Sequence, residues 1–300
     1  MLKLFVKNKI IQNIDTLLST VGKDNVAGML SEDGVYEKMK DSMTNDTYKI
    51  TWNGEPYVLR IPGAGTDKFV NRAREEFYTK QAVERGCCPA TEFYNQGKVK
   101  LTKYIENART FDCTKDDIRQ AVDLLQRFYS STPGEERSLL DEIRAYEELY
   151  NDKSLIHPEY GFVKQVVLDY LYDENGNKKY TLEISHGDTI PFNFLINGSG
   201  MHLIDYEYSG MLSKSWDYGS FVSELELYQN IDRNKLISEI AEIDKTINTD
   251  TVLTWSYIVD FIWACWGWAK TGSGVDYNEY SNERFTKALK FYLQYATHDI

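Results

Sequence analysis

The stretch 184–219, ISHGDTIPFNFLINGSGMHLIDYEYSGMLSKSWDYG, carries the strongest structural signal in this chain. Its apolar runs 194–196 and 201–204 flank Asn-Gly-Ser-Gly, a turn composition that is typical of a β-hairpin. Antiparallel pairing of the two runs places Asn193 and Asp205 together at the open end of the hairpin, where facing residues have Cβ atoms about 4.5–5.5 Å apart. The sequence therefore predicts a hairpin that brings an amide and a carboxylate side by side.

Three polar side chains of this stretch indicate phosphoryl transfer. The oxygens of Asn193 and Asp205 can share one hard cation such as Mg²⁺. Asp188 lies five residues before Asn193, on the loop that leads into the hairpin, and is expected to face whatever the cation binds. A base-like Asp, an Asn five residues later and a second Asp are the ordered set that phosphoryl transfer uses in protein kinases. The alternative is a polar loop before an ordinary hairpin, which the complete set disfavours.

The same residues carry a family resemblance. His186-Gly-Asp188 stands where protein kinases have His-Arg-Asp, and Ile-Asp205-Tyr-Glu207 stands where they have Asp-Phe-Gly. The stretch resembles the aminoglycoside and choline kinase branch of the kinase-like fold. This resemblance implies that Asp188 is catalytic, that Asn193 and Asp205 bind Mg²⁺, that Glu207 assists a second metal ion, and that His186 braces the loop.

Composition limits the class of protein. The chain has 300 residues, enough for one large domain or two smaller ones with ample core. The formal net charge of -12 argues against a nucleic-acid substrate and suits a cationic one. The first 18 residues are too broken by Lys and Asn for a signal peptide or a membrane span. No metal-site spacing relates the cysteines, which predicts reduced thiols in a cytoplasmic protein: Cys87, Cys88, Cys113 and Cys265.

The N-terminal third predicts a helix at 9–18, strands at 35–39, 47–52 and 57–61, and a helix at 66–86. Strand alternation in 57–61 puts Arg60 on one face and Leu59 and Ile61 on the other. A basic residue inside an apolar strand needs a partner or a ligand, and Glu75, or alternatively Glu76, is the expected partner. An exposed Arg on an edge strand is the remaining alternative.

Further motifs sharpen the resemblance. Met43-Thr44-Asn45, the run YVLRIPGAGT at 57–66 and the pattern NRxRE at 71–75 precede the 184–219 stretch. This order is similar to that of bacterial choline kinases of the choline/ethanolamine kinase family, over about residues 35–268. It implies an α+β, bilobal protein kinase-like fold with an antiparallel-sheet N-lobe at 1–105 and a mostly helical C-lobe at 106–300. Related kinases usually carry Gly-Gly where Asp41-Ser42 stands here.

The resemblance also implies the ligands: ATP as phosphate donor, Mg²⁺, and a small amino alcohol as acceptor. The hairpin tip around residue 42 would cover the ATP phosphates, and Arg60 with its partner Glu75 would hold them. The backbone of the segment that follows a strand at 98–104 would form hydrogen bonds to adenine. The ATP-binding residues expected on this basis are Ser42, Thr44, Asn45, Arg60, Glu75, Tyr104 and Ile105.

The C-terminal part predicts helices at 116–130, 139–150 and 160–171 and an aromatic helical run at 255–268. Trp263 and Trp266 are three residues apart and share a helix face. Aromatic faces recognise quaternary ammonium groups, and the pair resembles the Phe-x-Trp-x-x-Trp element of choline kinases. An aromatic core stripe is the alternative. Tyr208 is a further candidate for the acceptor wall, and Asp217 is expected to tie the loop structurally.

The resulting hypothesis is ATP-dependent phosphorylation of the choline hydroxyl to give phosphocholine. The expected partner is a small cationic alcohol, without nucleic acid and without a membrane span, and the oligomeric state is left open. The alternatives are a kinase for ethanolamine, another amino alcohol or an aminoglycoside, and a catalytically inactive kinase-like binding module.

Overall fold

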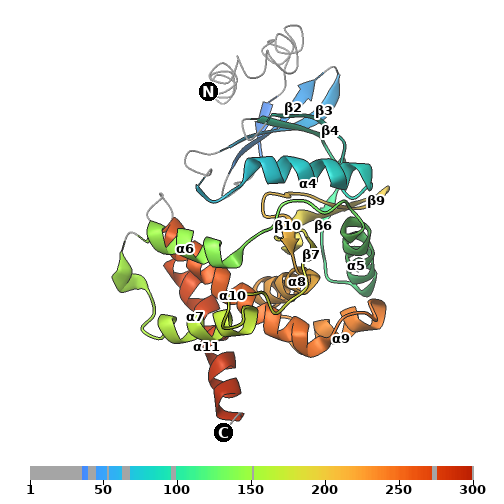
Figure 1. Cartoon of the computed structure of the whole chain (residues 1–300). Coiled ribbons are helices and arrows are strands. Elements are labelled where there is room, and N and C mark those ends of the chain that lie inside the picture. Colours follow the sequence, from blue (N-terminus) through green and yellow to red (C-terminus); the bar gives the residue numbers. More distant parts are fainter. Residues whose placement is uncertain are drawn as a thin grey trace. The chain divides into compact units, whose positions relative to one another are not determined.

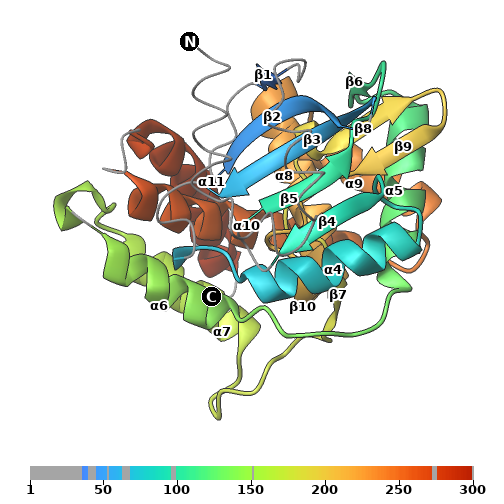
Figure 2. The same cartoon turned by 90° about the horizontal axis from the view of Figure 1, so that it is seen from above.

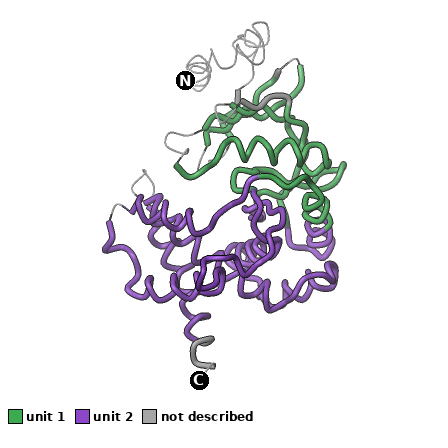
Figure 3. The backbone as a smooth tube through the Cα atoms, viewed as in Figure 1, with its two compact units in different colours: residues 1–111, 123–134, 192–209 green, residues 112–122, 135–191, 210–300 purple. Residues whose placement is uncertain are grey.

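The structure is a computed structural model that describes residues 36–39, 45–52, 54–62, 68–95, 99–150, 152–271 and 276–298. The helix predicted at 9–18 and the candidate residues Ser42 and Thr44 lie outside these ranges. The chain forms two compact units (Figure 3). Unit 1 comprises residues 1–111, 123–134 and 192–209, and unit 2 comprises residues 112–122, 135–191 and 210–300. The units group the hairpin stretch 192–209 with the N-terminal residues, while the lobe boundary at residue 105 stays a prediction.

Unit 1 contains a five-stranded antiparallel sheet with helix α4, Arg72–Glu84, beside it (Figures 1 and 2). Asn71 caps this helix by accepting a hydrogen bond from the backbone N–H of Arg74 at 3.1 Å. The strand order is β1-β2-β3-β5-β4, and the predicted strands near 35–39, 47–52, 57–61 and 98–104 are confirmed. The strands are β1 Tyr36–Lys38, β2 Asn45–Trp52, β3 Glu55–Pro62, β4 Thr91–Asn95 and β5 Val99–Lys103.

Strand β3 is a central strand whose side chains alternate as predicted. Leu59 and Ile61 are buried, while Arg60 points to the other face. Arg60 pairs in register with Thr47 on β2 and with Lys100 on β5. Because directly opposed residues share a face of the sheet, this register sets two cationic side chains next to each other.

The predicted hairpin is confirmed in unit 1. Strand β8, Phe194–Asn197, pairs antiparallel with β9, Gly200–Leu203, and a short strand β6, Arg109–Thr110, extends this sheet. The turn is tighter than predicted, because Asn197 and Gly200 face each other as a pair. The side chain of Asn197 closes the turn by accepting from the N–H of Ser199 at 2.9 Å.

Unit 2 is mostly helical around α10, which is buried along most of its length and contacts α6, α7, α8, α9 and α11 (Figure 1). Close packing of α8 on α10 requires Gly219, since a Cβ there would lie 2.8 Å from the backbone nitrogen of Ser256. The helices predicted at 116–130, 139–150 and 160–171 and the helical run at 255–268 are confirmed. The helices are α5 Lys115–Tyr129, which both units share, α6 Leu139–Leu149, α7 Tyr160–Leu171, α8 Lys214–Gln229, α9 Arg233–Ile243, α10 Thr249–Lys270 and α11 Asn278–His298.

The remaining elements are short: the strands β7 Glu183–Ser185 and β10 Gly210–Leu212, which pair antiparallel, and the 3-10 turns η2 Lys153–Leu155 and η3 Pro191–Asn193. Within the described ranges, no helix combines the length and the apolar character needed to cross a membrane.

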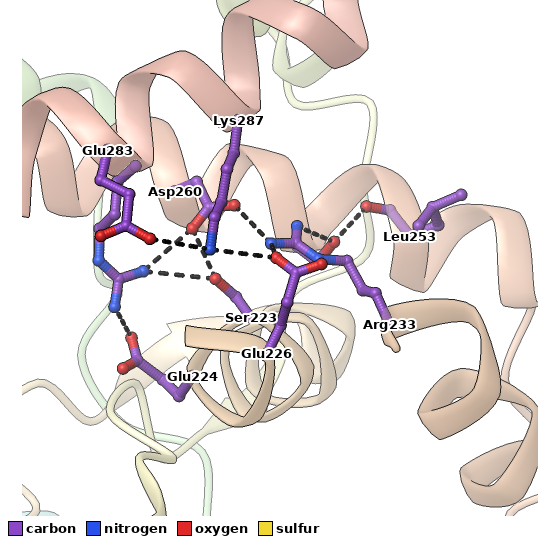
Figure 4. A network of polar contacts seen from close by, with 10 residues as sticks. Ser223, Glu224, Glu226, Arg233, Leu253, Asp260, Glu283 and Lys287 are labelled. Atoms are coloured by element: carbon purple, nitrogen blue, oxygen red, sulfur yellow. Dashed lines mark hydrogen bonds and ion pairs between the residues drawn. The ribbon is translucent and has the colours of Figure 1, made fainter. Parts of the chain in front are cut away.

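A buried ionic network ties four helices of unit 2 together (Figure 4). Asp260 on α10 accepts from Arg233 of α9 at 2.8 Å and from Arg284 of α11 at 3.0 Å. It also accepts from the hydroxyl of Ser223 on α8 at 2.6 Å. The Asp260 carboxylate is 1% exposed, and it compensates the two guanidinium charges together with Glu226, which pairs with Arg233, and Glu224, which pairs with Arg284.

Candidate functional site

Arg60 is the first candidate residue whose contacts the structure gives. Its guanidinium forms an ion pair with Glu75 of α4 and donates to Oδ1 of Asp205 at 2.9 Å. Glu75 is fully buried, whereas Glu76 pairs with the exposed Lys80. The predicted pairing of Arg60 with Glu75 is confirmed, and the edge-strand alternative is wrong because β3 lies inside the sheet.

Two further cationic side chains join this pair, and neither was predicted as a site residue from the sequence. The guanidinium of Arg72 lies 2.9 Å from Glu75 and 3.5 Å from Glu207, and Nζ of Lys100 lies 3.9 Å from Glu75. Arg72 precedes Glu75 by three residues on one helix face, a spacing that could have indicated the contact. The result is a cluster in which three cations adjoin three carboxylates: Arg60, Arg72, Lys100, Glu75, Asp205 and Glu207.

Asn45 and Glu207 belong to the same cluster. The amide nitrogen of Asn45 donates to Glu207 at 3.3 Å, and its oxygen accepts from Arg72 at 3.5 Å. Both side chains are buried. The carboxylate of Glu207 is thus occupied by an amide and a guanidinium, and its part in metal binding stays a prediction.

Asn193 and Asp205 lie at the open end of the hairpin, as predicted. The N–H of Ile204 donates to the carbonyl of Asn193 at 2.9 Å and continues the strand pairing to that end. Asp205 adopts the left-handed conformation with φ 66° and keeps 26% of its side chain exposed. One carboxylate and one amide suit Mg²⁺, which retains waters and binds substrate phosphates for its other ligands. The described part of the chain has no group of three or more His, Cys, Asp or Glu residues arranged for a metal.

The expected adenine segment follows β5. The N–H of Tyr104 donates to the carbonyl of Pro56 at 3.1 Å, and Nζ of Lys49 lies 3.9 Å from the centre of the Tyr104 ring. Tyr104 and Ile105 are partly exposed. Adenine binding by this segment stays a prediction.

The loop that carries Asp188 lies in unit 2 and is held by Asp217. The fully buried Asp217 carboxylate accepts from the hydroxyl of Ser185 at 2.8 Å and from the N–H groups of His186 and Gly187 at 2.7 and 2.9 Å. The Nδ1 atom of buried His186 accepts from the N–H of Asp188 at 3.3 Å. These bonds fix the loop backbone and leave Asp188 partly exposed, so His186 and Asp217 have contacts that suit a bracing role.

An aromatic cluster in unit 2 contains the predicted tryptophan pair. The rings of Trp263 and Trp266 meet edge to face with centroids 6.2 Å apart, as their shared helix face requires. The Trp266 ring also lies 5.2 Å from Tyr277 and 6.3 Å from Tyr280, which the sequence analysis missed. Tyr208 is buried in unit 1, and its role toward the acceptor stays a prediction.

Charged groups of both signs lie near this cluster, and the central guanidinium carbon of Arg284 is 4.6 Å from the ring centre of Tyr280. Burial raises the pKa of Tyr280 well above its ordinary value, the nearby Arg284 opposes that rise, and the carboxylates of Glu224 and Asp188 add to it. The Tyr280 hydroxyl is therefore neutral at physiological pH. Trp216 connects the cluster to the loop of the predicted catalytic carboxylate, because its indole N–H donates to the carbonyl of Gly187 at 3.0 Å and its ring centre lies 6.0 Å from that of Trp263.

Comparison with known proteins identifies the family. The family model described as choline/ethanolamine kinase matches residues 36–242, more than half of the chain. The chain belongs to the choline/ethanolamine kinase family. It is accordingly a choline kinase-like phosphotransferase, and the resemblance inferred from its motifs is confirmed.

Individual relatives agree with this assignment. Protein LicA of Haemophilus influenzae is 26% identical over 261 residues, which cover 83% of this chain and 98% of that protein. The crystal structure of choline kinase LicA from Streptococcus pneumoniae is similar with a TM-score of 0.73 and 24% identity, over 93% of this chain and 98% of that one. A crystal structure of LicA in complex with AMP has a TM-score of 0.68 and 22% identity, over 90% and 96%. These likenesses confirm the predicted α+β protein kinase-like fold.

Proposed function

We propose that this protein transfers the γ-phosphoryl group of ATP to the hydroxyl of choline. The observation that carries the choice of acceptor is the cluster of Trp263, Trp266, Tyr277 and Tyr280, which Trp216 connects to the loop that carries Asp188. A trimethylammonium group has no hydrogen-bond donor and is held by aromatic faces. Membership of the choline/ethanolamine kinase family supports the reaction class.

Unit 1 would hold the phosphate donor. Arg60 and Lys100 would neutralise the phosphate oxygens, and buried Glu75 would orient Arg60 through their ion pair. Nucleotide binding by a related LicA supports this assignment. Asn193 and Asp205 would hold Mg²⁺, which supplies further neutralisation of phosphate charge when bound.

Unit 2 would hold the acceptor. Asp188 would orient the choline hydroxyl and accept its proton as the oxygen forms its bond to the γ-phosphorus and the bond to the ADP oxygen breaks. The ammonium would lie against the tryptophan and tyrosine faces. Phosphoryl transfer has little covalent chemistry for a protein to perform, so most of the rate enhancement would come from positioning and from charge neutralisation.

The state of Glu224 favours choline over ethanolamine. A primary ammonium donates three hydrogen bonds and needs carboxylates, but the buried Glu224 forms an ion pair with Arg284. Arg284 compensates the charge of Glu224 and engages its carboxylate. The cluster therefore offers aromatic rings for recognition, which suit a group that cannot donate hydrogen bonds.

An acceptor panel tests the proposal. Release of ADP from Mg·ATP is measured by a coupled assay with choline, ethanolamine and kanamycin. We expect kcat/KM for choline to exceed that for ethanolamine at least about tenfold, since cation–π contacts with desolvated cations contribute on the order of 1–2 kcal/mol. A preference for ethanolamine or kanamycin would overturn the assignment. An ATP-dependent thermal shift without acceptor-stimulated turnover would support the inactive binding module instead.

Replacing Trp266 with leucine should weaken choline binding selectively. We expect the KM for choline to rise roughly 5–30-fold, the equivalent of about 1–2 kcal/mol of cation–π attraction, with the KM for ATP unchanged. Steady-state kinetics with each substrate varied measures both values. Trp268→Phe is the positional control, because the Trp268 ring packs on Tyr150 and Phe285 away from the cluster. An equal loss in both variants would contradict the acceptor role of Trp266.

The affinity for ATP should fall as the pH rises through about 8. Burial and the charge of Arg60 together lower the pKa of Lys100 to about 8, although Asp205 and Glu207 partly oppose this shift. Below that pH the ammonium is charged and attracts phosphate, and above it the attraction is lost. We expect the KM for ATP to increase severalfold between pH 7 and pH 9, and Lys100→Arg to flatten the profile. If the KM for ATP depends on pH in Lys100→Arg as it does in the wild type, Lys100 is not the cause of the pH dependence.

A further inference from the structure

Arg137 is a fully buried cation of unit 2 that the reaction scheme above does not use. It lies just before α6, where its N–H donates to the carbonyl of Met211 in β10 at 3.0 Å. Gly210 makes room for it, because a Cβ there would lie 2.7 Å from Cβ of Arg137. The backbone of this residue is therefore anchored to the strand that pairs with β7, directly before the Asp188 loop.

The guanidinium of Arg137 divides its donors between two partners. Its Nε and one terminal nitrogen donate to the two oxygens of Glu142 at 2.8 and 3.0 Å, which compensates the charge. The other terminal nitrogen donates to the carbonyl of Gly187 at 3.1 Å. Gly187 has φ 85°, a left-handed conformation that favours glycine, and it immediately precedes Asp188. One donor of Arg137 thus fixes the peptide from which Asp188 extends.

The same guanidinium lies over the rings of two tryptophans. Its central carbon lies 4.4 Å from the ring centre of Trp216 and 5.7 Å from that of Trp263. The indole N–H of Trp216 donates to the Gly187 carbonyl as well, at 3.0 Å. Arg137 therefore touches both the loop that carries the candidate base and a ring of the candidate acceptor wall.

We propose that Arg137 is a positioning residue that fixes Asp188 relative to the aromatic wall through Gly187 and Trp263. This inference rests on the proposed function, because the role of Arg137 is to set the distance between the choline hydroxyl and the carboxylate of Asp188. The planar fork of arginine binds both oxygens of Glu142, donates to Gly187 and lies near two aromatic rings, so lysine is not an equivalent replacement. A misplacement of about 1 Å at a reacting centre costs on the order of 10²-fold in rate.

Arg137→Lys and Arg137→Met test the role in the full-length protein. We expect kcat with choline to fall at least tenfold in the lysine variant and about 100-fold in the methionine variant. The KM for choline should rise severalfold and the KM for ATP should stay within twofold, because the phosphate-binding candidates belong to unit 1. Arg144→Lys changes an exposed arginine of the following helix α6; it is the matched control and should leave all three values unchanged.

A double-mutant cycle distinguishes positioning from simple structural support. Arg137→Lys is combined with Trp263→Phe, and kcat/KM for choline is measured for all four proteins. We expect the combined loss to be at least threefold smaller than the product of the single losses, because both changes disturb one contact. Multiplicative losses, or a lysine variant with wild-type kcat, would overturn the role of Arg137. If the methionine variant does not fold, the lysine variant and the double-mutant cycle still test whether Arg137 positions Asp188. A wild-type protein that does not phosphorylate choline would overturn the proposed function itself.

Discussion

Replacing Asp188 with alanine is expected to lower kcat with choline about 10²–10⁴-fold, the contribution that positioned acid–base groups usually make. Binding of Mg·ATP should stay within about threefold of wild type. The reason is that the phosphate-binding candidates Arg60, Glu75 and Asp205 contact one another within unit 1, whereas Asp188 lies on a loop of unit 2. Single-turnover kinetics gives the chemical step, and calorimetric titration with Mg·ATP gives the affinity.

The controls for this experiment separate charge from shape. Asp188→Asn keeps the size of the side chain and removes its basicity, so it should lose nearly as much rate as Asp188→Ala. Asp169→Asn removes an exposed carboxylate of α7 and should leave kcat unchanged. Turnover near the wild-type rate in Asp188→Ala would remove Asp188 from the mechanism.

Replacing Asp260 with alanine is expected to lower the free energy of unfolding of unit 2 by about 3 kcal/mol, the lower end of the range for breaking a buried ion pair. The substitution removes the carboxylate that two buried guanidinium groups share, while Arg284 keeps Glu224 and Arg233 keeps Glu226. Asp260 is 1% exposed and receives hydrogen bonds from Arg233 and Arg284. Urea denaturation followed by tryptophan fluorescence measures the change in the free energy of unfolding. The signal reports mainly on unit 2, because five of the six tryptophans lie in its residue ranges.

The matched control is Glu226→Ala at the rim of the same network. Glu226 also pairs with Arg233, at 2.6 Å, but its side chain is 28% exposed, and water can replace it. The expected loss is at most about 1 kcal/mol. Equal losses in Asp260→Ala and Glu226→Ala would show that burial does not set the strength of this network.

Several parts of the fold and site could be predicted because short stretches of sequence determine them. The apolar runs around Asn197-Gly198 specify the hairpin, and the strand alternation around Arg60 identifies a buried cation that needs a carboxylate. The choice of Glu75 over Glu76 follows from helix periodicity once the buried face of α4 is known. Each of these inferences depends on neighbours within a few residues or on one repeating pattern.

Other residues could not be predicted because their roles depend on contacts between distant segments. Arg137 stands in the polar stretch PGEERS, whose composition indicates a surface loop, yet packing against Trp216 and Trp263 buries it completely. Lys100 resembles Lys103 of the same strand, and only the register with β3 brings it to Arg60. Tyr277 reaches Trp266 from the segment that leads into α11. No local pattern specifies such contacts.

Direct identification of the product tests the central claim most sharply. The protein is incubated with choline, Mg²⁺ and ATP labelled in the γ-phosphate, and the labelled product is identified by chromatography and mass spectrometry. We predict phosphocholine and ADP in equal amounts from the wild type, and phosphocholine formed at least about 10²-fold more slowly by Asp188→Ala. Labelled inorganic phosphate alone, or label on ethanolamine but never on choline when both are supplied, would contradict the account.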